Sequence, residues 1–121
     1  MIMELKIRTI ADRKTDDERV IFDVIEDCSL GDYLVLDTTF DKDGYPSNLH
    51  RHTYRFSPLD VKKGEVIFLY SKSGKYRKSN IKDTKTPVHL FYWGLDIQVW
   101  NNDGDRVILI HCDEAEFKDF E

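Results

Sequence analysis

Histidine and cysteine side chains are the first candidates for chemistry, because imidazole and thiolate groups bind metals and act in catalysis. The chain has four histidines and two cysteines. A zinc site drawn from His50, His52, His89 and Cys112 is one hypothesis. None of these residues has the close ligand spacing of a zinc finger or of an HExxH helix. The pattern therefore favours solvated and core side chains, and we expect no metal.

The N-terminus indicates an intracellular, cytoplasmic protein. Charged residues at Glu4, Lys6 and Arg8 interrupt the apolar stretch that a signal peptide needs. Cys28 and Cys112 are far apart in sequence, and in a reducing compartment we expect two free thiols. Apolar runs of about 18 residues are absent, so we expect no transmembrane helix and no membrane partner.

Oxygen side chains at Asn101, Asp103 and Asp105 have the one-three-five spacing of a calcium loop. The glycine of this "NNDGD" stretch is in the fourth place instead of the sixth, so a tight hairpin turn is the preferred interpretation. The chain also has no G-x-S-x-G elbow and no phosphate-binding glycine loop. We therefore expect neither enzyme activity nor a cofactor.

A basic segment is the strongest candidate for binding. Residues 72–85 contain six basic residues and one acid, a charge of +5. Because the net charge of the chain is −5, the remaining residues together carry −10. An aromatic ring among cations is typical of nucleic-acid binding, whereas a solvated loop that protects a sheet edge would have the same composition. The candidate binding surface is Lys72, Lys75, Tyr76, Arg77, Lys78, Lys82 and Lys85.

Short strands must position these side chains, because apolar residues alternate with polar ones or form short apolar runs in many places. We expect strands at residues 3–8, 19–25, 33–40, 52–56, 65–71, 88–93, 95–100 and 106–112. The connection over residues 71–87 lacks strand character and is predicted to cross the surface. Helices have little support beyond a turn or two after Asp113.

The alternation also predicts which side chains form the core. The expected core residues are Leu5, Ile7, Phe22, Val24, Leu34, Leu36, Tyr54, Phe56, Ile67, Leu69, Leu90, Val99, Val107 and Leu109. Trp93 and Trp100 are not assigned to either environment by the pattern. A tryptophan exposed beside the long connection would mark a binding surface.

Three stretches together resemble one family. "HTYRFSPLDVKKGEVIFLY" has a Tyr-Arg-Phe strand, a proline, a lysine before glycine and a second strand. "ERVIFDVIEDCSLGDYLVLD" has a strand, a short link and a Gly-polar-aromatic step. "VWNNDGDRVILI" has a polar turn before an apolar last strand. In their order and spacing along the chain, the three stretches resemble the tail domain of nuclear lamins and its bacterial stand-alone relatives, over residues 20–110.

The resemblance implies an immunoglobulin-like, antiparallel β-sandwich of about eight strands, as one domain over residues 1–121, with an acidic tail at 111–121. The lamin coiled coil is absent, and "FYW" at 91–93 and the acidic tail have no counterpart in the family. A non-catalytic interaction or scaffolding module is the function implied, binding another protein through loops or an edge strand. The alternative is nucleic-acid or polyanion binding through residues 72–85, and the oligomeric state stays open.

Overall fold

The computed structural model describes residues 3–39, 52–100, 105–116 and 118–120 of the chain. Within these ranges the only helical element is a 3₁₀ turn, η1 (Leu30–Asp32). The strands in chain order are β1 (Leu5–Ala11), β2 (Arg19–Val24), β3 (Cys28–Ser29), β4 (Tyr33–Thr39), β5 (Thr53–Arg55), β6 (Asp60–Val61), β7 (Val66–Tyr70), β8 (Arg77–Asn80), β9 (Pro87–Tyr92) and β10 (Asp105–His111).

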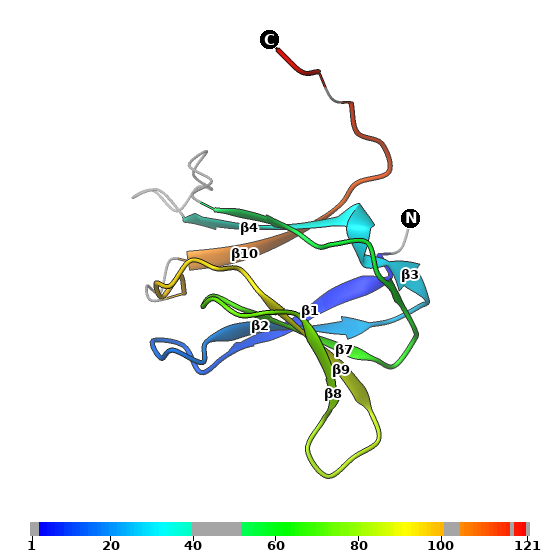
Figure 1. The fold of residues 1–121 in the computed structure, drawn as a ribbon, viewed down its shortest axis with the longest axis vertical. Coiled ribbons are helices and arrows are strands. Elements are labelled where there is room, and N and C mark those ends of the chain that lie inside the picture. Colours follow the sequence, from blue (N-terminus) through cyan, green and yellow to red (C-terminus); the bar gives the residue numbers. More distant parts are fainter. Residues whose placement is uncertain (1–2, 40–51, 101–104, 117, 121) are drawn as a thin grey trace.

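The strands form a sandwich of two facing sheets (Figure 1). The larger sheet has the order β1-β2-β7-β9-β8 and the smaller sheet the order β10-β4-β5, while β3 and β6 form a short separate pair. Leu5, Phe22 and Ile67 of the larger sheet are fully buried, as are Tyr33 and Val35 of the smaller one. The predicted all-β sandwich is therefore confirmed.

One strand pair departs from the expected antiparallel pattern. β7 and β9 run parallel, with Val66 beside Val88 and Tyr70 beside Tyr92. The other pairs within the described ranges are antiparallel. After β7 the chain first forms β8 at the edge and then returns through a hairpin as β9. A parallel neighbour requires such a long crossover connection.

The prediction of a strandless connection over residues 71–87 is wrong. It contains the whole of β8, and Pro87 is already the first residue of β9. All four residues of β8 are exposed, so the strand has no alternating apolar residues by which its sequence could be recognised.

The predicted strand at residues 95–100 is also wrong. The backbone N–H groups of Val99 and Trp100 donate to Oε2 of Glu18, at 2.7 and 3.2 Å, instead of to a neighbouring strand. Gly94, with a φ of 82°, turns the chain away from the extended conformation before the segment begins. Val99 is nevertheless buried as predicted, and Trp100 is fully buried.

The predicted side-chain phase is wrong in β4. Tyr33 and Val35 are buried in the core, whereas Leu34 and Leu36 are only partly buried on the opposite face. Because side chains alternate along a strand, an error of one residue moves every side chain to the other face. Ile7 has the predicted phase, since it lies beside the core residue Phe22, but it is on the edge strand β1 and is 36% exposed.

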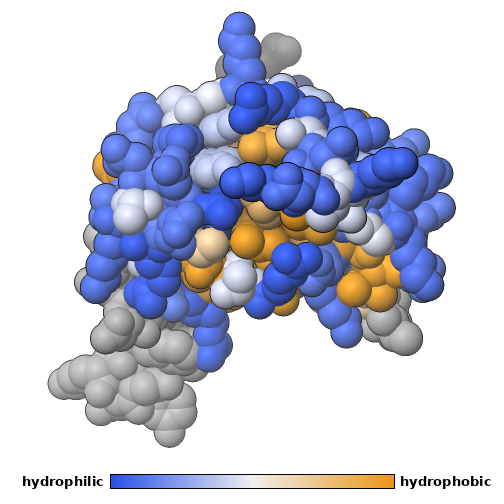
Figure 2. Space-filling model, turned by 90° about the horizontal axis from the view of Figure 1, so that it is seen from below, coloured by the Kyte–Doolittle hydropathy of each residue, from blue (hydrophilic) through white to orange (hydrophobic). Residues whose placement is uncertain are grey.

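The remaining predicted core residues are placed correctly. Leu5, Phe22, Val24, Phe56, Ile67, Leu69, Leu90 and Val99 are buried, and Tyr54, Val107 and Leu109 pack partly buried against the core. Leu90 belongs to a second apolar cluster, on the outer face of the larger sheet. Seen from below, apolar residues on this side of the molecule are crossed by hydrophilic side chains (Figure 2). The guanidinium of Arg19, for example, lies 4.9 Å from the centroid of the Phe68 ring.

The predicted hairpin turn at "NNDGD" cannot be compared with the structure. Its residues 101–104, together with His50, lie outside the described residues. The tail is described at 113–116 and 118–120, and these residues form no helical turn, so that expectation is wrong for them.

Phe56 provides a test of the core. It is 1% exposed, and its ring centroid lies 5.8 Å from that of Phe22 and 5.1 Å from that of Phe91. We expect Phe56→Ala to lower the free energy of unfolding by about 3–5 kcal/mol, because it leaves a cavity between the sheets. Denaturant unfolding measures this, with Ile97→Ala, at a residue 55% exposed, as the control, which should change stability by less than about 0.5 kcal/mol. Equal effects of the two variants would contradict the packing described.

Candidate functional site

β8 is one edge of the five-stranded sheet and is exposed along its whole length (Figure 1). It pairs with β9 on one side, from Arg77 beside Leu90 to Asn80 beside Pro87. On its other side the described part of the chain contributes no strand. The backbone N–H and C=O groups that point outward from such an edge can pair with an added strand.

Five of the six cations of the predicted binding surface surround this strand. Lys75 precedes β8, Arg77 and Lys78 lie in it on opposite faces of the sheet, and Lys82 and Lys85 lie in the turn to β9. All five are exposed. Within the described residues, none of the five forms an ion pair with an acidic side chain. We call β8 with these five cations the basic edge.

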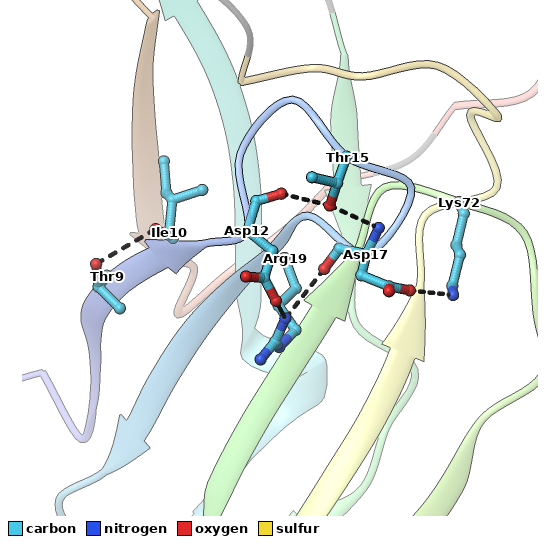
Figure 3. Close-up of polar contacts among 7 residues, drawn as sticks. All are labelled: Thr9, Ile10, Asp12, Thr15, Asp17, Arg19 and Lys72. Carbon is cyan, nitrogen blue, oxygen red and sulfur yellow. Dashed lines mark hydrogen bonds and ion pairs between the residues drawn. The ribbon is translucent and has the colours of Figure 1, made fainter.

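Lys72 has different surroundings from the basic edge. Its Nζ lies 2.8 Å from Oδ1 of Asp17, in the loop between β1 and β2 (Figure 3), and 5.2 Å from the centroid of the Tyr70 ring. The hydrogen bond between the two side chains raises the pKa of Lys72 and lowers the pKa of Asp17. Its charge is therefore already compensated within the chain, unlike that of the other five cations.

Tyr76 holds the start of β8 against the sheet. Its hydroxyl oxygen lies 2.8 Å from Nδ1 of His89, whose Nε2 lies 3.0 Å from Oε1 of Glu65. A neutral His89 that donates from Nε2 to the carboxylate accepts at Nδ1 from the tyrosine hydroxyl. The Tyr76 ring also stacks on the His89 ring, with 6.0 Å between centroids, and lies 5.0 Å from the Phe91 ring. Side chains next to β7 and within β9 thus anchor the edge strand.

This chain of carboxylate, imidazole and hydroxyl has the order of a catalytic triad. Burial and the negative charge of Glu65 raise the pKa of the Tyr76 hydroxyl, so the oxygen keeps its proton at neutral pH. His89 is only 3% exposed. The three side chains together hold the start of β8 against the sheet.

Glu65 is held in its charged form. Burial works to raise its pKa, but hydrogen bonds from the backbone N–H of Lys62 and from His89, with the nearby charge of Lys78, outweigh it. The pKa of Glu65 consequently lies below its usual value. Protonation at low pH would weaken the acceptor that orients His89, and with it the support of Tyr76.

An aromatic pocket of about 320 Å³ lies beside the start of β8. It is lined by Tyr54, Ser57, Pro58, Leu59, Gly74, Tyr76, Phe91 and Tyr92. Gly74 allows the chain to pass close to one wall, since a Cβ there would lie 2.5 Å from Cδ1 of Tyr92. Neither tryptophan is an exposed marker of a binding surface: Trp100 is fully buried and Trp93 partly buried. The exposed aromatic next to the long connection is Tyr76, at 46%.

A larger open cleft of about 1000 Å³ lies next to the loop between β1 and β2. Among its lining residues are Asp16, Glu18, Ser71 and Asp96. Glu18 is 1% exposed, and its Oε2 accepts a 2.5 Å hydrogen bond from Oγ of Ser71 as well as the two backbone bonds from residues 99 and 100. Because its bonds are directed into the protein, we assign Glu18 a structural role.

The described members of the proposed zinc set, His52, His89 and Cys112, are not brought together. Each described histidine pairs instead with its own carboxylate, the pairs being His52 with Asp37 at 3.1 Å, His89 with Glu65 at 3.0 Å and His111 with Asp113 at 3.5 Å. No group of three or more His, Cys, Asp or Glu side chains is arranged to hold a metal ion in the described ranges. The calcium-like residues Asn101 and Asp103 lie outside them.

Both cysteines are free thiols. Burial, with the negative charges of Glu4, Asp32 and Asp27, raises the pKa of Cys28 to about 11, so this thiol is protonated and unreactive at neutral pH. The Sγ of Cys112 lies 3.0 Å from the carbonyl oxygen of Glu114.

Two side chains of the site, Glu65 and His89, were not predicted to support the basic segment. His89 carries no signal beyond its metal-binding capacity, and Glu65 is one acid among many.

Comparison with protein-family models, curated proteins and solved structures gives no match to this chain. Among the helices of the described residues, none has the length and apolar character to cross a membrane.

Glu65 generates a prediction about pH. Its folded-state pKa is depressed, so its carboxylate stabilises the protein above an unfolded-state pKa of about 4.3, and this contribution is lost as the pH falls through the folded-state pKa. Glu65→Gln has no such proton to bind. Denaturant unfolding measured from neutral to strongly acid pH should therefore show a shallower loss of stability for Glu65→Gln than for the wild type. Glu26→Gln, at an exposed position, is the matched control, and parallel profiles for all three proteins would contradict the assignment.

Proposed function

We propose that the protein is a non-catalytic interaction module that binds an extended, acidic segment of another protein along the basic edge. The observation that carries this proposal is that exposed cations surround an open backbone edge at β8. Strand addition obtains affinity from main-chain hydrogen bonds and specificity from the neighbouring side chains. Cations on both faces of the edge favour acidic side chains on the added strand.

Lysine and arginine on an edge strand also discourage pairing with other sheets. That protection acts against neutral and basic strands, and the same charges attract an acidic one. The aromatic pocket beside β8 offers an apolar contact that protection alone does not need. The two features together favour selective binding over simple avoidance of aggregation.

A nucleic acid or another polyanion is the competing ligand. Residues outside 72–85 carry a charge of −10, so a long polyanion that extends past the basic edge meets repulsion. Tyr76 is 46% exposed, but part of its ring lies against His89 and Phe91, so only the remaining part could stack on a base. These observations favour a short acidic peptide segment.

The resemblance to lamin tail domains supports a binding role without catalysis. In the stretch that carries it, Tyr54 and Phe56 lie toward the core, Arg55 is exposed, and Gly64 turns the chain with a φ of 91°. We place the module in the cytoplasm, a compartment that suits two free thiols.

The test uses a fluorescent synthetic peptide of alternating glutamate and valine, with binding followed by fluorescence anisotropy. We expect saturable binding that weakens as salt is raised. The double variant Arg77→Glu/Lys78→Glu should bind about tenfold more weakly, because two attractions become repulsions. Lys62→Glu/Lys63→Glu makes the same charge change at exposed positions away from β8 and should bind nearly as the wild type does.

A second peptide, N-methylated at alternate backbone amides, keeps the charge but lacks the donors for a ladder. Strand addition predicts that it binds far more weakly than the unmethylated peptide. Equal binding of the two peptides would refute strand addition. If a single-stranded oligonucleotide binds more tightly than the peptide and loses affinity in Arg77→Glu/Lys78→Glu, the surface is a polyanion site and the proposal fails.

A further inference from the structure

An acidic segment leaves the body of the protein after β10. Within the described residues, the last backbone hydrogen bond before this segment joins the N–H of Cys112 to the carbonyl oxygen of Asp32, at 2.7 Å. Residues 113–116 and 118–120 are all exposed. In Figure 1 they run away from the β10-β4-β5 sheet, on the side opposite the β8–β9 hairpin. We call residues 113–120 the acidic tail.

The acidic tail complements the basic edge in charge. Its acids are Asp113, Glu114, Glu116 and Asp119, against the single cation Lys118. The basic edge, over residues 75–85, has five cations and one acid. The tail also has a large apolar side chain without a packing site, since Phe120 is 87% exposed. Among the described residues, the Phe120 ring contacts only the Lys118 ammonium, which lies 5.8 Å from the ring centroid.

The two segments also match in side-chain pattern. In an extended tail, Glu114, Glu116 and Phe120 point to one side and Asp113 and Asp119 to the other. An added strand would therefore place acids beside both faces of β8, where one face carries Arg77 and the other Lys78. The aromatic pocket opens where Tyr76 precedes β8, and its volume suits one phenylalanine side chain.

We propose that the acidic tail of one copy of this chain adds to the basic edge of a second copy, and that two copies exchange tails to form a symmetric dimer. The inference rests on the proposed function and names its partner. A second copy is favoured over the same copy because the tail leaves from the smaller sheet and β8 is the far edge of the larger one (Figure 1). Reciprocal exchange uses both sites of both copies, so the assembly closes at two.

The test is the mass and shape of the full chain in solution, by analytical ultracentrifugation over a range of protein concentrations. We expect a reversible dimer that dissociates at high salt. A variant that ends at Cys112 should be monomeric. Arg77→Glu/Lys78→Glu and Glu114→Lys/Glu116→Lys should each raise the dimer dissociation constant about tenfold or more. Lys62→Glu/Lys63→Glu should leave it nearly unchanged.

A charge exchange makes the experiment specific to this pair of surfaces. Combining Arg77→Glu/Lys78→Glu with Glu114→Lys/Glu116→Lys in one chain should restore the dimer, because the attraction is re-formed with opposite signs. Circular dichroism of each variant shows whether the sandwich is intact. A dimer that persists without the tail, or a charge exchange that restores nothing, overturns the inference. A full chain that is monomeric, and whose shape becomes more extended when the tail is removed, also overturns the inference. That result would assign the tail to the basic edge of its own copy.

The glutamate–valine peptide separates failure of this inference from failure of the proposed function. The tail-less variant should bind that peptide more tightly than the full chain does, since its edge has no competitor. If the full chain is monomeric but the tail-less variant binds the peptide, the edge recognises acidic strands of some other protein. If the tail-less variant binds no acidic peptide, the proposed function itself is refuted.

Discussion

The carboxylate of Glu18 is the contact on which the arrangement of the two sheets depends. One oxygen accepts hydrogen bonds from Ser71, where the chain leaves the larger sheet, and from Val99 and Trp100, shortly before it enters the smaller one. Buried hydrogen bonds to a charged group are strong, and removing the acceptor would leave two backbone N–H groups unpaired in the interior. The same contact holds Trp100 in the core, so one side chain fixes both the crossover toward β8 and the closing of the sandwich.

Much of the fold was predictable, because a strand that packs on one side needs alternating apolar residues. β2, β4, β5 and β7 fall within predicted segments, and β9 and β10 each begin one residue before theirs. The errors have local causes. Residues 33–37 have large side chains on both faces, so alternation alone could not tell Leu34 from Val35. Residues 95–100 alternate correctly for a strand, but the backbone N–H groups of Val99 and Trp100 donate to Glu18, a partner far away in sequence. Only the folded topology reveals that partner.

The candidate site was predictable in its charges and not in its supports. A cluster of cations around Tyr76 is visible in any listing of the residues, whereas β8 itself is polar on both faces and has no pattern. The contact of Glu65 with His89 arises from the parallel register of β7 and β9, which no local signal indicates. For the same reason Lys72 could not be separated from its neighbours, since its partner Asp17 comes from the loop between β1 and β2.

Because β9 pairs directly with β7, in parallel, the rest of the larger sheet does not depend on β8. In a meander of consecutive strands, β8 would lie between β7 and β9. β9 is held on one side by β7 and contributes Phe91 to the core, so four strands of the larger sheet remain complete without β8. All four side chains of β8 are exposed, so substitutions in this strand change the surface and not the interior. Over evolutionary time such a hairpin is free to exchange its charges and acquire new partners, while the architecture that carries it is inherited unchanged.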